Sequence, residues 1–174
     1  MPHTDPVLQI AVGTLQSHEY ENTRNMKTNP RRLALDSYPY RLEVATRLSD
    51  IDQQWHVNNV RIGEYYQETR VCFFRELSEQ FGARRVPGSR ILVAHHAMDY
   101  LAEIRYPGLV TSGLGIARIG KSSMELAGGL FQSGQCAGLC KTIIVHATAE
   151  GPVEIPQEYR EMLATRMLAA DAVP

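Results

Sequence analysis

Carboxylate, imidazole and amide side chains are concentrated in one short segment of the chain, Ser49 to Asn59. It lies between a run with strand-like alternation and a run with helical spacing, so these polar groups precede the start of a helix. A carboxylate there can orient or deprotonate a water molecule, or attack a carbonyl itself. The N–H groups of the first helical turn can stabilise an oxyanion. The segment therefore predicts acyl transfer to water; the alternative is that Asp50 and Asp52 only make hydrogen bonds within the loop.

The flanking periodicities define the elements that position this segment. Alternation of apolar and polar residues from Tyr40 to Leu48 predicts a half-buried strand. After Asn59 the apolar residues follow helical spacing as far as Phe81, and Gly82 is placed as a C-terminal cap, which predicts a helix of about six turns. Either Asn58 or Asn59 could cap its N-terminus.

The remainder of the chain predicts an antiparallel sheet. Strand-like runs separated by turn residues cover Ile91–Tyr106, Leu109–Ile119, Met124–Gln132 and Cys136–Ala147. A short closing helix should follow, with Pro156 in its first turn. The order predicts an α+β domain in which the sheet covers the apolar helix. Because such a sheet has exposed edges, we expect a dimer that continues it.

Length and composition limit the class of protein. The 174 residues, 44% hydrophobic and 21% charged, predict one globular domain at 39–174 after an N-terminal extension at 1–38, with one short ordered piece around Val7–Leu15. A net charge of -1 without basic clusters argues against nucleic acid as a partner. Without a spanning apolar run or a signal peptide, no membrane partner and a cytoplasmic location are expected. Three cysteines favour reduced thiols.

Two other patterns carry less weight. Gly115–Ser122 fits the phosphate-binding loop G-x-x-x-x-G-K-[ST], but the later apolar strand Lys141–Ala147 has no acidic residue to help hold magnesium, so we expect a turn between strands. His95 and His96 are adjacent on a strand and point to opposite faces, so they cannot bind one metal ion together. No metal site is predicted.

Several motifs in order resemble the hotdog-fold thioesterases of the 4-hydroxybenzoyl-CoA thioesterase type, with similarity to plant acyl-carrier-protein thioesterases. The resemblance covers roughly residues 40 to 168. It rests on Ser49-Asp50-Ile51-Asp52, His56-Val57-Asn58-Asn59, Tyr65/Tyr66, Glu68-Thr69-Arg70, Tyr100-x-x-Glu103, Ile119-Gly120-Lys121-Ser122-Ser123 and Ile155-Pro156-x-Glu158-x-Arg160.

The resemblance implies a hotdog fold, in which a five-stranded or larger antiparallel sheet wraps a long central helix. It also implies a homodimer or dimer of dimers with active sites at the subunit interface. Asp52 would be the general base or nucleophile and Asp50 its supporting residue. The backbone N–H near Asn59 would be the oxyanion donor.

His56 and Glu103 match catalytic positions of the plant enzymes, whereas Gln54 replaces a residue that is usually Asn. Trp55 replaces the Gly of many bacterial members, and would form a wall of the acyl pocket. Asn58 either caps the helix or lines the substrate site. The turn residues Lys121, Ser122 and Ser123 would hold the nucleotide or pantetheine part of coenzyme A, often across the dimer interface, or else form a solvated hairpin turn.

The prediction is therefore a hydrolase that cleaves acyl-CoA, or an acyl carrier protein thioester, to a free acid and a thiol. No cofactor is expected beyond coenzyme A as part of the substrate. A hydratase or dehydratase of enoyl thioesters on the same fold is the first alternative. The second is a non-catalytic module that binds acyl-CoA.

Overall fold

The computed structural model describes residues 26, 29–82 and 86–169. The predicted piece at 7–15 lies outside them. One sheet is formed by β1 (Tyr40–Ala45), β2 (Arg90–Tyr100), β3 (Leu109–Ile119), β4 (Ser123–Gln132), β5 (Gln135–Thr148) and β6 (Gly151–Pro152). The α-helices are α3 (Asn59–Phe81) and α4 (Gln157–Ala164), and the short 3-10 helices are η2 (Pro30–Leu33), η3 (Leu35–Ser37) and η4 (Leu48–Asp50).

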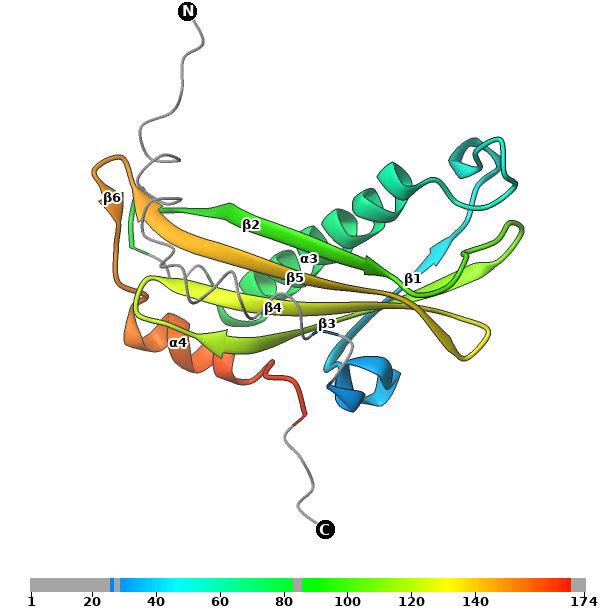
Figure 1. Ribbon diagram of the computed structural model, residues 1–174. Coiled ribbons are helices and arrows are strands. Elements are labelled where there is room, and N and C mark those ends of the chain that lie inside the picture. Colours follow the sequence, from blue (N-terminus) through cyan, green and yellow to red (C-terminus); the bar gives the residue numbers. More distant parts are fainter. Residues whose placement is uncertain (1–25, 27–28, 83–85, 170–174) are drawn as a thin grey trace, which may run out of the picture.

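The sheet has the strand order β1-β3-β4-β5-β2, with β6 paired to β5, and all its pairs are antiparallel. It curves along α3, which lies over one face (Figure 1). This confirms the predicted hotdog fold and leaves β1 and β2 as edge strands.

The helix forms where the sequence predicts it because both ends are capped. The Asn58 side chain accepts a hydrogen bond from the Val60 N–H, and Gly82 ends the helix at φ +72°. Its apolar face is buried in two clusters: Ile62, Tyr65 and Tyr66 pack near the start, and Phe73 and Leu77 near the end. Asn58 is therefore the cap, and Asn59 is the first helical residue.

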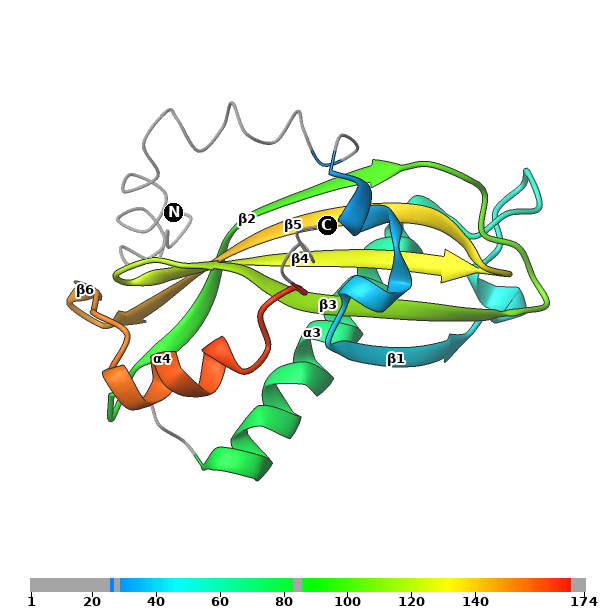
Figure 2. The ribbon, with the colours of Figure 1, turned by 90° about the horizontal axis from the view of Figure 1, so that it is seen from below.

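The core is completed on both faces of the sheet. On the α3 side, Leu126 of β4 packs against α3 and α4. On the opposite face, the alternate residues of β4 meet the segment 29–38, where Tyr38 packs against Phe131 and Arg32 pairs with Glu125 at 2.8 Å. Seen from below, this blue segment crosses the sheet (Figure 2). The described end of the N-terminal extension is therefore anchored to the domain.

Three local predictions differ from the structure. The strand predicted for 91–106 ends at Tyr100, because the N–H groups of Leu101 and Ala102 both bond the Ala137 carbonyl and the ladder stops there. Leu48 is 65% exposed, since η4 replaces the last residues of the predicted strand. Pro156 is the N-cap of α4 and precedes its first helical residue.

The predicted turn at Gly120–Ser122 is confirmed, because it connects β3 directly to β4. A phosphate-binding loop would be followed by a helix, so that alternative is wrong. Among the described helices, none is both long and apolar enough to cross a bilayer.

Candidate active site

The loop between η4 and α3 is shaped by hydrogen bonds that centre on Asp52. Its N–H donates to the His56 carbonyl at 3.0 Å, and its carbonyl accepts from the Trp55 N–H at 3.1 Å. Its Oδ1 accepts from the Gln54 N–H at 2.8 Å. The tight turn that results places Trp55 at φ +65°, in the left-handed region that favours glycine. Trp55, which stands where many bacterial members of the resembled family have Gly, thus adopts a backbone angle that Gly adopts freely.

Asp50 attaches this loop to the helix. Its buried carboxylate accepts hydrogen bonds from the Tyr65 hydroxyl at 2.7 Å and the Arg47 N–H at 3.0 Å, and its carbonyl accepts from the Asn58 N–H at 2.9 Å. Burial, together with the hydrogen bond to Asp50, raises the pKa of Tyr65. Tyr65 therefore remains a donor at neutral pH, and Asp50 occupies a supporting position beneath the loop.

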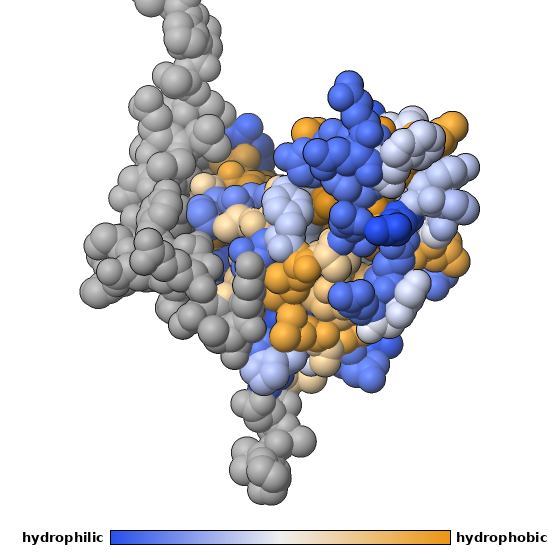
Figure 3. Space-filling view, turned by 45° about the vertical axis from the view of Figure 1, so that its right-hand side comes forward, coloured by the Kyte–Doolittle hydropathy of each residue, from blue (hydrophilic) through white to orange (hydrophobic). Residues whose placement is uncertain are grey.

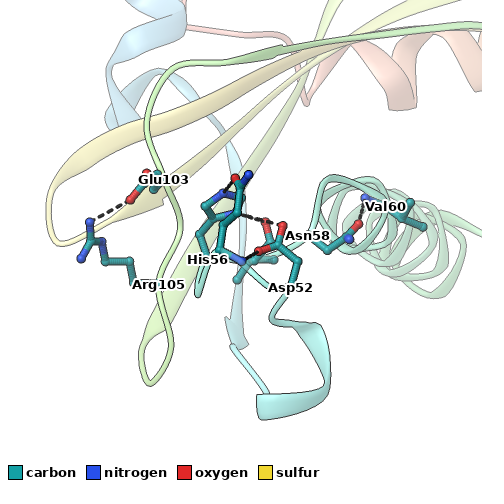
Figure 4. Close-up of polar contacts among 8 residues, drawn as sticks. Asp52, His56, Asn58, Val60, Glu103 and Arg105 are labelled. Carbon is teal, nitrogen blue, oxygen red and sulfur yellow. Dashed lines mark hydrogen bonds and ion pairs between the residues drawn. The ribbon is translucent and has the colours of Figure 1, made fainter.

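Asp52 and His56 form the one close pair of titratable groups in the loop. His56 Nδ1 lies 3.3 Å from Asp52 Oδ2, and His56 Nε2 lies 2.9 Å from Gln54 Oε1 (Figure 4). About a quarter of each side chain is exposed, at 26% for His56 and 25% for Asp52. The imidazole is held between a carboxylate and an amide, so its orientation is fixed while solvent still reaches the pair.

A cleft of about 360 Å³ lies beside this pair at the start of α3. It brings together three of the predicted residues, His56, Asn59 and Glu103. The rest of its lining is largely apolar and consists of Val57, Ile62, Tyr100, Leu101, Ala102 and Ile104. Polar groups at one wall and an apolar remainder suit a ligand with a reactive polar centre and an apolar tail.

Asn59, the first residue of α3, lines this cleft. Asn58 satisfies the Val60 N–H, and the Asn59 N–H makes no hydrogen bond with any described residue. First-turn N–H groups have no partner within their own helix and carry the positive end of its dipole. The residue that carries the predicted oxyanion donor therefore lines the same cleft as His56.

Of the predicted site residues at this end of the sheet, Asp52, Asn58 and Trp55 lie outside this cleft. Asp52 lines an adjacent open hollow together with Gln53, Gln54 and Asn58. His56 lines the cleft and contacts Asp52, so the two depressions meet at this pair of side chains. Glu103 is turned toward Arg105, with which it pairs at 2.8 Å (Figure 4). Trp55 is 79% exposed and lines neither depression.

The Lys121–Ser123 turn lies at the far end of the sheet from the Asp52 loop. β3 starts beside the β1 end that leads to the loop and runs for 11 residues, about 35 Å at roughly 3.3 Å each, before it reaches this turn. Lys121 is exposed and its Nζ lies 3.9 Å from Glu154. Within one chain, the turn and the cleft do not meet.

Sequence reasoning missed the apolar lining. Ile62 follows Asn59 by one helical turn, so helical spacing could have placed it beside Asn59 in the cleft. Tyr100, at the end of β2, and Ala102 and Ile104, just after it, enter the cleft for another reason. The segment after β2 folds back, and the Val57 N–H donates to the Ile104 carbonyl at 2.8 Å. That contact joins residues far apart in the sequence.

Comparison with known proteins identifies the family. The sequence model described as the thioesterase-like superfamily matches residues 46–163, more than half of the chain. The chain belongs to this superfamily. Its members and structural relatives that are called thioesterases support thioester hydrolysis as the general activity. No curated protein matches.

Solved structures agree with this membership. A Pseudomonas aeruginosa protein is 30% identical, covers 78% of this chain and 96% of its own, and has a TM-score of 0.64. A thioesterase from Thermus thermophilus, solved with coenzyme A and zinc, is 25% identical, covers 75% and 95%, and has a TM-score of 0.64. A predicted thioesterase from Bacillus stearothermophilus, at 22% identity, 75% and 98% coverage and a TM-score of 0.66, supports the fold.

Proposed function

We propose that this protein hydrolyses acyl-CoA thioesters, with Asp52 activating the water that attacks the carbonyl. The observation that carries the proposal is the contact between Asp52 and His56 beside an unbonded helix-start N–H, at the mouth of an otherwise apolar cleft. The coenzyme A bound to the Thermus thermophilus relative favours a coenzyme A ester over a carrier-protein ester.

The steps follow from the positions of the groups. The thioester oxygen accepts a hydrogen bond from the Asn59 N–H, which polarises the carbonyl. Asp52 removes a proton from water as its oxygen attacks the carbonyl carbon, and the Asn59 N–H stabilises the oxyanion that forms. Collapse of this intermediate breaks the C–S bond, and the thiolate takes up a proton. His56, 3.3 Å from Asp52, can relay the proton from the carboxylate to the leaving sulfur.

An alternative route uses Asp52 as the nucleophile. Its carboxylate would attack the thioester carbonyl and expel the thiolate, and water would then cleave the acyl-aspartyl anhydride. Both routes give the same acid and thiol. A hydratase would instead leave the thioester intact.

We further propose that a second copy of the chain completes the site. The unpaired edge of β2 offers backbone groups for strand pairing, and Val60, Val71 and Val93 are exposed on α3 and β2. The face at the loop end shows apolar surface directly beside strongly hydrophilic surface (Figure 3). A partner could bring its own Lys121–Ser123 turn to the coenzyme A part of the substrate.

Release of free thiol tests the function. The purified protein is mixed with short, long, branched and aromatic acyl-CoAs, and the thiol is trapped with a chromogenic disulfide. We expect hydrolysis of at least one class. Binding of acyl-CoA without thiol release across the whole panel would favour the non-catalytic module, and hydration of an enoyl-CoA without thiol release would favour the hydratase.

A further inference from the structure

Arg70 carries a positive charge that no described residue neutralises. It lies at the middle of α3, is half-buried, and makes no hydrogen bond or ion pair with any residue that the structure describes. Its neighbours on the helix differ, because Arg61 pairs with Glu64 and Arg75 with Glu79. Burial lowers the pKa of Arg70. The pKa of His96 is also lowered, first by the burial of His96 itself and second by the charge of Arg70. A cation withdrawn from water without a counter-charge is costly, so a ligand that supplies one would bind favourably.

The Arg70 side chain lines a second cavity, of about 400 Å³. Apart from Gln67, the rest of the lining is apolar and includes Val71, Phe74, Ile91 and Ile144. A single cation in a hollow with an otherwise largely apolar lining favours a ligand that is apolar along its length and anionic at its end.

This cavity and the active-site cleft both lie between α3 and β2. The cleft is lined by Asn59 and Tyr100, and the second cavity by Arg70 and Ile91, so helix and strand run antiparallel past both. Gly63 lies between the two on the helix, and a Cβ there would stand 3.8 Å from the Met98 methyl group. An acyl tail that runs from the cleft to the second cavity must therefore displace the Met98 methyl group, the end of a flexible side chain.

The spacing fits an extended acyl group. From Asn59 to Arg70 is eleven helical positions, about 16 Å at roughly 1.5 Å each. A thioester bound at the Asn59 N–H would therefore extend its tail past Gly63 toward the guanidinium.

We propose that Arg70 is a specificity-determining residue that binds a carboxylate at the far end of the acyl group, so that the preferred substrates are acyl-CoAs of dicarboxylic acids. This inference rests on the proposed hydrolase function and names its substrate class. The guanidinium would bind the carboxylate through two parallel hydrogen bonds, the arrangement in which arginine is most selective.

The test compares straight-chain acyl-CoAs of increasing length, each made with a methyl end and with a carboxylate end. For the wild-type protein we expect, at the length that reaches Arg70, a KM on the order of 10- to 100-fold lower for the carboxylate-ended ester. Arg70→Met should abolish or reverse this preference, and Arg70→Lys should retain part of it. Arg75→Met, an exposed change about 1.4 turns further along the same helix, is the matched control and should leave the preference intact. Gly63→Leu should remove the preference, because its side chain would occupy the space beside Met98 that the acyl tail needs.

The outcomes separate this inference from the function on which it rests. Thiol release with equal KM for both ends at every length, or a preference that survives Arg70→Met, would overturn the role of Arg70. A shift of the dimer to monomer in Arg70→Met with the preference unchanged would assign Arg70 to a carboxylate of the partner. If no acyl-CoA is hydrolysed, calorimetry with free dicarboxylic and monocarboxylic acids, on wild-type and Arg70→Met proteins of matched thermal unfolding, still decides whether Arg70 binds the anionic end.

Discussion

Asp52 and His56 touch each other but face different depressions of the surface, and this division assigns different roles to them. The hollow at Asp52 is open and polar, which suits the entry of water, while the cleft at His56 is mostly apolar, which suits the acyl group. The two side chains meet where water and thioester would have to react. This division supports the proposed role of Asp52 in activating the water.

Replacing Asp52 by Asn should lower the turnover number for a good acyl-CoA substrate by at least about 100-fold, the common scale for loss of a positioned base. The amide can still accept the Gln54 N–H that shapes the loop, so thermal unfolding should be nearly unchanged. Asp36→Asn is a matched control, since Asp36 is 95% exposed and pairs only with Arg41 among the described residues. Near-normal turnover by folded Asp52→Asn protein would remove Asp52 from the catalytic role.

Trp55 has a backbone conformation that an L-residue adopts only at a cost of roughly 1–2 kcal/mol. Trp55→Gly should relieve this strain, offset in part by greater freedom of the unfolded chain, and raise the free energy of unfolding by up to about 1 kcal/mol. The same change at Gln53, whose φ is not positive, should lower it. Urea denaturation of both variants measures the difference. A clear loss of stability in Trp55→Gly would mean that the indole packs against something, such as a second subunit, and would restore its predicted role as a pocket wall.

Among the elements, α3 connects the chemistry to the core, and its shortest contact with Asp50 is a buried hydrogen bond; Arg61 Nε of the same helix lies farther from Asp50 Oδ1, at 3.9 Å. The Tyr65 hydroxyl donates to Asp50, and the Thr69 hydroxyl, one turn on, donates to the Tyr65 carbonyl and can accept from the Ser112 hydroxyl. The loop is thereby fixed to the helix at a residue distant from the reacting atoms.

Tyr65→Phe should leave the Asp50 carboxylate buried with one donor fewer and cost about 1–3 kcal/mol in the free energy of unfolding. The freed loop should also lower turnover, with little effect on KM, because Asp52 moves with it. Thr69→Val removes a buried hydroxyl from the same helix without touching the loop and serves as the comparison. If turnover falls equally in both variants at equal stability, the Tyr65–Asp50 bond has no special part in positioning the loop.

Local signals in the sequence were sufficient to predict the elements, and contacts between distant segments account for what was missed. The alternation in β1, the helical spacing from Asn59 and the Gly–Lys–Ser turn are properties of neighbouring residues, and each was confirmed. The end of β2 depends on where the Ala137 carbonyl lies, and the anchoring of Arg32 depends on Glu125. The cavity at Arg70 has no local signature at all, because Arg70 is distinguished only by lacking an ion-pair partner among the described residues.

At the scale of the whole molecule, the distance between the turn of Lys121, Ser122 and Ser123 and the active-site cleft of the same chain leaves two hypotheses for the turn. The turn either is a solvated hairpin end, or binds coenzyme A at the active site of a partner. A symmetric dimer that continues the sheet at β2 would allow the second, since each partner brings the same surface to the other. The expected state in solution is then two chains, which light scattering coupled to gel filtration measures.

Subunit mixing tests whether the site is shared. Asp52→Asn alone should be inactive, and the triple Ala variant of Lys121, Ser122 and Ser123 should have a raised KM for acyl-CoA. If each site combines Asp52 of one chain with the turn of the other, a mixed dimer has one site with both defects and one with neither. Random reassociation of equal amounts should therefore restore about a quarter of wild-type activity at low substrate concentration. If the turn served its own chain, no wild-type site could form in the mixed dimer, and if it served no site, the triple Ala variant alone would have the KM of the wild-type protein. Activity of the mixture that stays at the sum of the separate variants would therefore exclude a site shared between the two chains.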